Sequence, residues 1–260
     1  MIKEFSLEGK TALITGAGRG IGTGIAEVFA EAGATVVVNS LTRTYLDKFT
    51  AGLQQRTGRQ VVPLPGDVTT VKGVEALLSE SLKVTGSVDI LVNNLGDSIR
   101  HPLVALRDDE ADLSDVDIQK ILSLNLLATI YCCRAFGRHM LSRRNGKVIN
   151  ISSFAALQGA PGNSLYSSAK SAITGLTRSL ALEWAGYGVA VNAIAPGLFP
   201  DRTTVGPEGY AIAVERAQSG IPLRRVGELR EIGLAALFLA SDASNYVVGQ
   251  TLAVDGGMTT

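Results

Sequence analysis

Short apolar runs alternate along the chain with longer segments in which apolar residues recur every three or four positions. The short runs have the length of buried strands, and the periodic segments have one apolar face, as helices do. Strands that alternate with helices predict an α/β fold around a mainly parallel sheet. We expect strands at 11–15, 34–39, 60–64, 88–92, 147–151, 188–194 and 251–254. We expect helices around 25–30, 74–82, 116–140, 166–184 and 228–239.

A glycine-dense turn, GAGRGIGTG, separates the first expected strand from the first expected helix. Glycine permits positive φ angles and lets a ligand approach the backbone, and the N-terminus of a helix attracts phosphate. The strict GxGxxG fingerprint does not fit, because position 21 is isoleucine. The spacing TGxxxGxG fits and predicts a dinucleotide pyrophosphate site; a glycine-rich turn without a ligand is the alternative. The residues involved are Gly16, Arg19, Gly20, Ile21 and Gly22.

The segment that follows the second expected strand contains no carboxylate to receive a ribose hydroxyl. An NAD-preferring site usually has an acidic residue there, whereas cations and hydroxyls suit a ribose 2′-phosphate. No acid lies between Val36 and Leu46, and Ser40, Arg43 and Arg19 are available to donate hydrogen bonds. The sequence therefore predicts a preference for NADP(H), with NAD(H) as the alternative if both arginines are merely solvated.

Three side chains in the segment SFAALQGAPGNSLYSSAK, at 153–170, can reach one carbonyl group. Tyr166 and Lys170 are four residues apart in an expected helix and so share one face. A nearby ammonium favours the phenolate, so we expect Lys170 to lower the pKa of Tyr166, which can then act as a general acid and base. Ser153 follows the expected strand 147–151, and its hydroxyl is placed to hold a substrate oxygen. Taken alone, the spacing YxxxK more often marks a solvated pair of side chains.

Two long segments without a clear period accompany these motifs. Residues 97–117 are polar and predict a surface loop beside the active-site rim, and residues 198–227 are rich in Pro, Gly, Arg and Thr. Long segments of this kind are often lids, and we expect the second one to cover the substrate. Asn125 is a polar residue within the apolar helix 116–140, where it either ties backbone groups together or holds a water that passes protons.

The composition favours a single domain that acts on small molecules. At 260 residues and 46% hydrophobic content the chain can form one substantial core, and we expect one domain over 1–260. Lys and Arg number 24, as do Asp and Glu, so no net field draws the protein to nucleic acid or to a membrane. The N-terminus lacks a signal-peptide core, and adjacent Cys132 and Cys133 lie in an apolar pattern. We therefore expect a cytoplasmic protein without a disulfide or a metal site.

The ordered motifs resemble those of the short-chain dehydrogenase/reductase family over about 7–258. They are TGxxxGxG at 15–22, NNxG at 93–96, a serine 13 residues before YxxxK, an asparagine in the long helix, Pro196-Gly197 and VDGG at 254–257. The closest resemblance is to the branch of ~250 residues that includes 3-oxoacyl-carrier-protein reductases. It implies a seven-stranded, doubly wound, Rossmann-like sheet with helices on both faces. It also implies NAD(P) as cofactor, hydride transfer at a carbinol carbon, and commonly a homotetramer.

Carried over by position, the resemblance assigns a role to each site residue. Tyr166 becomes the acid and base, Lys170 holds the nicotinamide ribose, and Ser153 steadies the carbonyl. Asn125 corresponds to a proton-relay asparagine. The other cofactor-binding positions that it implies are Asp67 at the adenine, Val68, Asn94 and Gly96 in the cofactor wall, Pro196 and Gly197.

At two positions the chain departs from the family pattern. Leu95 stands where the family has a small residue and is expected to crowd the cofactor wall; Asp201 stands near where a threonine usually contacts the nicotinamide carboxamide. The leading hypothesis is an oxidoreductase for an alcohol/ketone pair. A catalytically inactive nucleotide sensor or scaffold is a second reading, although it would be expected to lose Ser153, Tyr166 or Lys170. An epimerase or dehydratase with the same YxxxK chemistry is a third, although such chains usually carry a larger C-terminal domain.

Overall fold

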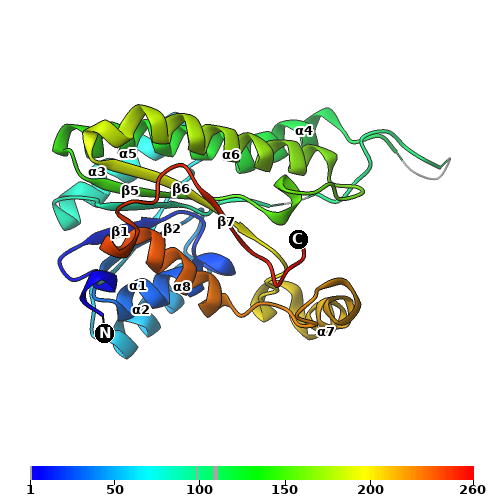
Figure 1. Cartoon of the computed structure of the whole chain (residues 1–260), viewed down its shortest axis with the longest axis horizontal. Helices are drawn as coiled ribbons and strands as arrows, with labels where there is room; N and C mark the ends of the chain where they lie inside the picture. The colour runs from blue at the N-terminus through cyan, green and yellow to red at the C-terminus, as the bar shows by residue number, and fades with distance from the viewer. Residues whose placement is uncertain (1, 98, 108–110) are drawn as a thin grey trace.

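Seven parallel strands form the sheet around which the chain folds (Figure 1). In the computed structural model, which describes residues 2–97, 99–107 and 111–260, the strand order is β3-β2-β1-β4-β5-β6-β7. Every neighbouring pair of strands is parallel. The expected fold class, a doubly wound Rossmann-like sheet, is confirmed. The strands are β1 Thr11–Ile14, β2 Thr35–Ser40, β3 Val61–Pro65, β4 Ile90–Asn93, β5 Gly146–Ile151, β6 Val189–Pro196 and β7 Thr251–Val254.

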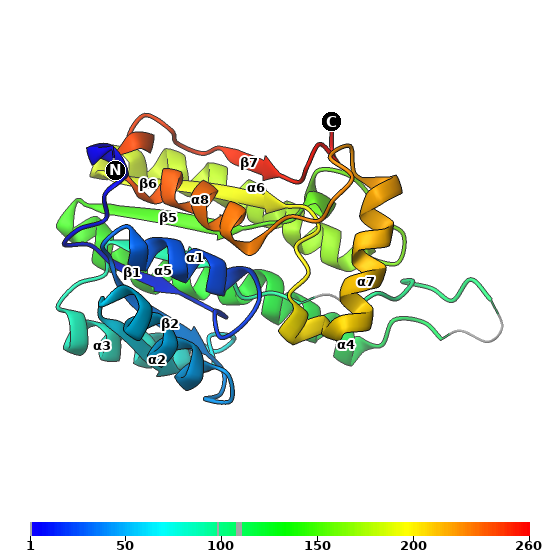
Figure 2. The ribbon, with the colours of Figure 1, turned by 90° about the horizontal axis from the view of Figure 1, so that it is seen from below.

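Helices cover both faces of this sheet. Figures 1 and 2 show α1, α2 and α8 against one face and α3, α5 and α6 against the other. Successive strand residues point to opposite faces, so Ile14 packs in the core with α1 and Leu13 in the core with α5. The α-helices are α1 Ile21–Glu31, α2 Leu46–Thr57, α3 Val71–Thr85, α4 Asp115–Leu122, α5 Ala128–Arg143, α6 Ser164–Trp184, α7 Arg202–Gly220 and α8 Leu229–Ala240, with short 3-10 turns at Lys3–Phe5, Phe154–Ala156, Ala185–Tyr187 and Asp242–Ser244.

Helices α1 and α8 pack closely because two glycines lie at their contact. A Cβ at Gly24 would lie 2.2 Å from the carbonyl oxygen of Leu229, and a Cβ at Gly233 would lie 2.4 Å from the carbonyl oxygen of Gly24. At the start of α8, the Glu231 carboxylate accepts the N–H of Glu228 at 2.8 Å. The glycine-rich turn that leads into α1 is therefore held against a helix from the end of the chain.

The expected helix 116–140 is confirmed and is longer than predicted. It runs from Asp115 to Arg143 as α4, a π turn at Ser123–Leu127, and α5. By length and composition alone, it is apolar enough to cross a membrane. Core helices pass the same test, and in this fold Cys132, Cys133 and Phe136 are buried against the sheet. The cysteines have the packing role that the sequence predicted.

Two helices lie where the sequence predicts none. Helix α2 buries only Leu46, Thr50 and Leu53, so its apolar period is too sparse to read. Helix α7 fills much of the expected lid, 198–227, and its period is broken by a kink at Gly206, where φ is 69°. The segment 198–227 is thus mostly helical, and Figure 2 shows α7 beyond the carboxyl ends of the strands; its role as a lid stays a prediction.

The polar segment 97–117 is shorter as a loop than predicted. Helix α4 begins at Asp115, and the Ser114 hydroxyl caps it by accepting the N–H of Asp117 at 3.1 Å. Residues 98 and 108–110 of the expected loop lie outside the described residues.

Candidate active site

The predicted phosphate turn lies where the sheet order reverses, between β1 and β4. The Asn94 side chain, just after β4, donates hydrogen bonds to the carbonyl oxygens of Thr15 and Gly16, each at 3.0 Å. The Thr15 hydroxyl in turn accepts the N–H of Asn94 at 3.1 Å. Open α/β sheets bind ligands in the crevice at such a point, outside the carboxyl ends of the strands. Asn94 therefore braces the turn at the place where a ligand is expected.

The two sides of the glycine-rich turn differ in how much space they leave. Gly16 has a φ of 62°, and a Cβ there would lie 2.9 Å from the Cα of Leu95 and 3.1 Å from its Cδ1. Leu95 therefore packs against the base of the turn, and the expected crowding of the cofactor wall stays a prediction. Gly20 has a φ of 68°, and a Cβ there would meet nothing within 4 Å. This open side, at the N-terminus of α1, fits a phosphate of a dinucleotide.

The residues predicted for the adenosine end gather at the carboxyl ends of β2 and β3. Ser40 ends β2, and a Cβ at Gly18 would lie 3.0 Å from its hydroxyl oxygen. Asp67 follows β3 and accepts hydrogen bonds from the N–H and the hydroxyl of Thr69, at 2.9 and 2.6 Å. The Val68 side chain is buried in the core. Val68 can therefore offer a cofactor only its backbone.

The two arginines expected at the 2′-phosphate already have partners. The guanidinium of Arg19 lies 5.7 Å from the centroid of the Tyr45 ring, a cation–π contact. Arg43 pairs with Asp47 at 2.8 Å, and both side chains are exposed. Because an exposed ion pair contributes little free energy, Arg43 can exchange this carboxylate for a phosphate.

Ser153, Tyr166 and Lys170 come together where β5 ends and α6 begins. Ser153 is 5% exposed, and its hydroxyl accepts the N–H of Ala155 at 3.2 Å and also hydrogen-bonds with Tyr166. Lys170 is 3% exposed, and its Nζ donates to the carbonyl oxygen of Ile151 at 2.9 Å. The same Nζ lies 5.8 Å from the centroid of the Tyr166 ring. The structure thus joins the three side chains that the sequence singled out.

Burial controls the ionisation of this cluster. It raises the pKa of Tyr166; the hydrogen bond with Ser153 lowers that pKa and the charge of Asp97 raises it, and the net shift is upward. Burial also lowers the pKa of Lys170 to about 8. The expected lowering of the Tyr166 pKa by Lys170 is therefore wrong for this structure. Loss of hydration disfavours the charged form of each group and is the largest cause of both pKa shifts.

Comparison with known proteins places this site in a family. The family model described as enoyl-(acyl carrier protein) reductase matches residues 16–259. The chain belongs to the short-chain dehydrogenase/reductase family. It is 39% identical to 2-dehydro-3-deoxy-D-gluconate 5-dehydrogenase of Bacillus subtilis, over 97% of this chain and 96% of that protein. It is also 39% identical to 3-oxoacyl-[acyl-carrier-protein] reductase of Chlamydia trachomatis, over 97% and 98% of the two chains.

Solved structures of other short-chain dehydrogenases/reductases share the whole fold. A gluconate 5-dehydrogenase from Burkholderia cenocepacia, in complex with NADP and tartrate, matches with a TM-score of 0.89 and 36% identity over 98% of this chain and 97% of that one. An NADPH-dependent 3-quinuclidinone reductase from Rhodotorula rubra matches with a TM-score of 0.87 and 30% identity over 98% and 93%. The named relatives are dehydrogenases and reductases. The leading hypothesis, an NAD(P)-dependent oxidoreductase of alcohol/ketone pairs, is confirmed at the level of the family.

In this short-chain dehydrogenase/reductase, Asn125 is fully buried in the π turn of the long helix. Its side chain accepts the N–H of Asp97 at 3.2 Å and donates to the carbonyl oxygens of Asp97 and Ile121, at 2.7 and 2.9 Å. A Cβ at Gly96 would lie 2.8 Å from Asn125 Oδ1 and 2.9 Å from Lys170 Nζ. Asn125 thus has the backbone-tying role, and its place in a proton relay stays a prediction.

The segment that follows β6 contacts both the end of β7 and the glycine-rich turn. Gly197 follows Pro196 and donates its N–H to the carbonyl oxygen of Val254 at 2.9 Å. A few residues later, the Asp201 carboxylate accepts the N–H of Gly20 at 2.8 Å, across 181 residues of sequence. The sequence does not predict this contact, because no local pattern reports which distant segments become neighbours.

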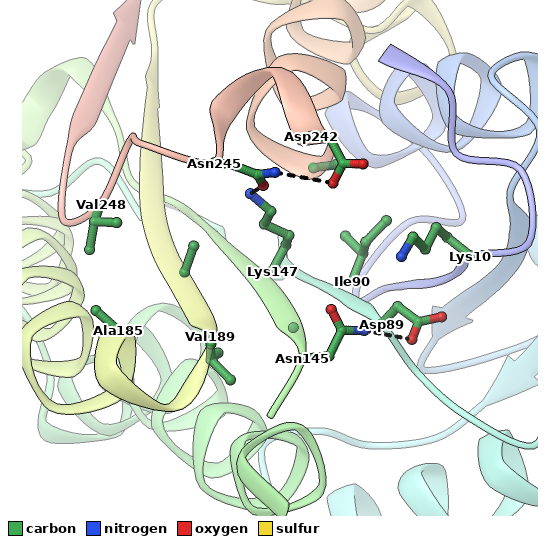
Figure 3. Close-up of a pocket in the computed structure, with 14 residues that line it drawn as sticks. Lys10, Asp89, Ile90, Asn145, Lys147, Ala185, Val189, Asp242, Asn245 and Val248 are labelled. Atoms are coloured by element: carbon green, nitrogen blue, oxygen red, sulfur yellow. Dashed lines mark hydrogen bonds between the residues drawn. The ribbon is translucent and has the colours of Figure 1, made fainter. Parts of the chain in front are cut away.

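A separate pocket lies at the amino ends of the strands, across the sheet from the predicted site residues (Figure 3). Its volume is about 320 Å³, and residues at the amino ends of β4, β5 and β6 line it. Two of its charged groups have partners within the protein: Lys147 donates to Asn245 at 2.8 Å, and Asp89 accepts from Arg143 at 2.8 Å. None of the predicted site residues lines it. The predicted site residues gather instead at the carboxyl ends of the strands.

Proposed function

We propose that this protein is an NADP(H)-preferring oxidoreductase that interconverts an alcohol and a ketone, with Tyr166 as acid and base. The convergence of Ser153, Tyr166 and Lys170 next to the glycine-rich turn carries the proposal. Lys170 lies against Gly96, and Asn94, two residues earlier, is bonded to the turn. A carbonyl beside Tyr166 would therefore also lie near a dinucleotide bound at the turn.

The protein's own groups hold the substrate oxygen and move one proton. A bound nicotinamide would supply or accept the hydride at the carbinol carbon. In ketone reduction, the Ser153 hydroxyl donates a hydrogen bond to the substrate oxygen, and the neutral phenol of Tyr166 gives that oxygen its proton. Lys170 then stabilises the phenolate, and Asn125, whose Oδ1 lies near Lys170 Nζ on the same side of Gly96, helps to return a proton.

The residues present fit NADP(H) at its diphosphate and at its adenosine. The open side of the turn at Gly20 and the N-terminus of α1 suit the diphosphate. Ser40 and Arg19 flank the expected adenosine ribose, and Arg43 is within an exposed pair that a phosphate can break. The NADP-bound and NADPH-dependent relatives support this choice. Asp67 would hold the adenine.

The substrate proposed is a small carbonyl compound. The relatives compared are named for sugar acids and for 3-oxoacyl groups on acyl carrier protein, and these classes share a ketone. The lid helix α7 and the loop from 97 to 114 would shape the pocket. We also propose a cytoplasmic homotetramer that needs no nucleic acid or membrane.

A cofactor-oxidation screen tests the proposed function. NADPH would be supplied with simple ketones, oxidised sugar acids and 3-oxoacyl thioesters, and consumption of NADPH with at least one class is expected. A protein that binds NADPH and oxidises it with none of these classes would point to the inactive sensor or scaffold. The screen thereby separates the two functions.

The Tyr166→Phe variant tests the acid and base directly. Removing this proton donor should lower kcat by ~10²- to 10⁴-fold, while the dissociation constant of NADPH stays nearly unchanged, because little volume is lost. Steady-state kinetics and cofactor fluorescence report the two quantities. Tyr187→Phe is the matched control, since Tyr187 is exposed and contacts Arg144, away from the site. Near-normal turnover by the Tyr166→Phe variant would remove Tyr166 from the mechanism.

A further inference from the structure

We propose that Asp201 sets the affinity for the cofactor by competing with its diphosphate for the N-terminus of α1. The inference rests on the proposed function, because it takes the ligand of the glycine-rich turn to be a dinucleotide. The Asp201 Oδ2 atom accepts the N–H of Gly20 at 2.8 Å. Gly20 is the N-cap residue of α1, on the open side of the turn. The carboxylate therefore lies where an anionic group of the ligand would bind.

The start of α1 lacks an anionic partner of its own. Its N-cap is a glycine, which has no side chain to cap the helix, and its first turn contains no acidic residue. The unpaired N–H groups and the dipole at such a terminus favour negative charge. A carboxylate from α7 meets this need in the free protein. A phosphate would meet it in the complex, and the two anions repel each other if both are present.

Asp201 is held in its place by the first turn of α7, whose N-cap it forms. Its Oδ1 accepts the N–H of Thr203 at 3.0 Å, and its Oδ2 accepts the hydroxyls of Thr203 and Thr204 at 2.6 and 3.0 Å. Burial acts to raise the pKa of Asp201, but the bonds from Thr203, Gly20 and Thr204 outweigh it and lower the pKa. The group is therefore an anion at neutral pH.

The same contact links cofactor binding to the position of the lid. The first turn of α7 is separated from the rest of the helix by the kink at Gly206, which has a φ of 69° and is followed by Pro207. The turn from Arg202 to Val205 can therefore shift as a unit when Asp201 releases Gly20. In this scheme, the free protein holds the turn docked on α1, and the dinucleotide has to displace it.

The Asp201→Asn variant separates the charge from the cap. Asparagine keeps a carbonyl oxygen for the Thr203 N–H but places an NH₂ group where Oδ2 accepts the Gly20 N–H. Because one charge-assisted hydrogen bond no longer has to be broken, the dissociation constant of NADPH should fall roughly five- to fiftyfold. Asp201→Ser, a second capping residue, should act in the same direction and guards against a folding defect of the first variant. Asp255→Asn is the control, since Asp255 likewise bonds to the N–H and hydroxyl of a threonine, Thr259.

The measurements are NADPH titrations by fluorescence and hydrogen exchange of peptides that span 198–206. In the wild type, NADPH should speed exchange in this segment; in Asp201→Asn, exchange should be fast with or without NADPH. Unchanged or weaker NADPH binding by both Asp201 variants would overturn the inference while the proposed function stands. Absence of both NADPH and NADH binding in the wild type and in all variants would instead overturn the proposed function and this inference with it.

Discussion

At the scale of single residues, the site keeps two ionisable groups away from water. Lys170 has its Nζ bonded to the Ile151 carbonyl oxygen, and the neighbouring Tyr166 is bonded to Ser153. Burial lowers the pKa of Lys170 to about 8 and raises that of Tyr166. A neutral phenol is the form that can give a proton to a substrate, so the burial suits ketone reduction. The burial of Lys170 also lowers the free energy of unfolding, because this lysine is charged and hydrated in the unfolded chain at neutral pH and loses that hydration on folding.

The stability cost of Lys170 should depend on pH. Its pKa is about 8 in the folded protein against 10.5 in the unfolded chain, so the unfolded chain binds more protons between these values. The wild type should therefore gain stability as pH rises from 8 to 10.5; below pH 8 the full cost, on the order of 3 kcal/mol, persists. Lys170→Met removes the charge and should be more stable than the wild type, most of all below pH 8. Urea unfolding at pH 7 and pH 9.5 measures this, and equal pH dependence in the two proteins would contradict it.

We expect cofactor choice to depend on side chains at the end of β2 and in the glycine-rich turn. Ser40 and Arg19 can donate hydrogen bonds to a 2′-phosphate, so kcat/KM should favour NADPH over NADH by roughly ten- to a thousandfold. Ser40→Asp adds a partner for the ribose hydroxyl and repels the phosphate, so it should reverse the preference. Ser40→Asn, which adds similar volume without charge, is the control. Steady-state kinetics with both cofactors decide the point, and equal efficiencies in the wild type would refute it.

At the scale of elements, the close contact between α1 and α8 holds in place the helix that follows the glycine-rich turn. The two helices approach so closely that a Cβ at Gly24 would overlap the backbone of Leu229. The glycines that permit this approach lie within the helices, where glycine is otherwise unfavourable. The low helix propensity of these glycines destabilises the two helices, and the burial of apolar side chains between α1, α8 and the sheet offsets this cost.

Replacing Gly24 by alanine should destabilise the protein although alanine is the better helix former. The added Cβ would lie 2.2 Å from a carbonyl oxygen, so α1 and α8 must separate, at a cost of about 1 to 3 kcal/mol. Gly175→Ala in α6 is the matched control, because a Cβ there meets nothing within 4 Å and should be neutral or stabilising. Thermal unfolding compares the two. A Gly24→Ala protein at least as stable as the wild type would argue against close packing at this crossing.

At the scale of the whole molecule, the surface carries apolar groups that suggest self-association. Strand β7 forms one edge of the sheet, and Leu252 on it is partly exposed. Leu182 on α6 is 86% exposed, and Tyr246, before β7, is fully exposed. Only a third of the most apolar stretch of the 115–143 helix is buried within the chain. Apolar surface distributed over several elements is typical of proteins that form closed assemblies.

These surfaces predict self-association, and the family resemblance points to a homotetramer, which we expect at micromolar concentration. Light scattering coupled to size exclusion should give a mass near four times the 27.2 kDa chain. Mild salt should leave the mass unchanged, since the contacts would be mainly apolar. A stable monomer under these conditions would contradict the expected self-association. A dimer would contradict the tetramer and would mean that only one of the apolar surfaces mediates association.

The sequence by itself determined the features that depend on neighbours along the chain. Each strand is apolar over its own length, and the long helix repeats its apolar residues every turn, so the α/β class could be read directly. The order of the motifs, from the glycine-rich turn to Ser153, Tyr166 and Lys170, identified the family. The sequence pattern did not predict helix α2, because only three of its residues are buried. It did not predict α7 either, because Gly206 and Pro207 interrupt the apolar period of that helix.

Only the tertiary structure decided the features that depend on distant neighbours. The pKa of Tyr166 rises because folding removes water from it, and no spacing of residues reports that loss. Asp201 reaches Gly20 because the chain that follows β6 crosses the carboxyl ends of the strands, although β4 and β5 separate β6 from β1 in the sheet. Hydrogen bonding and hydration act over a few ångströms in space, whatever the distance along the chain. The sheet order sets those distances, and it comes from packing the whole molecule.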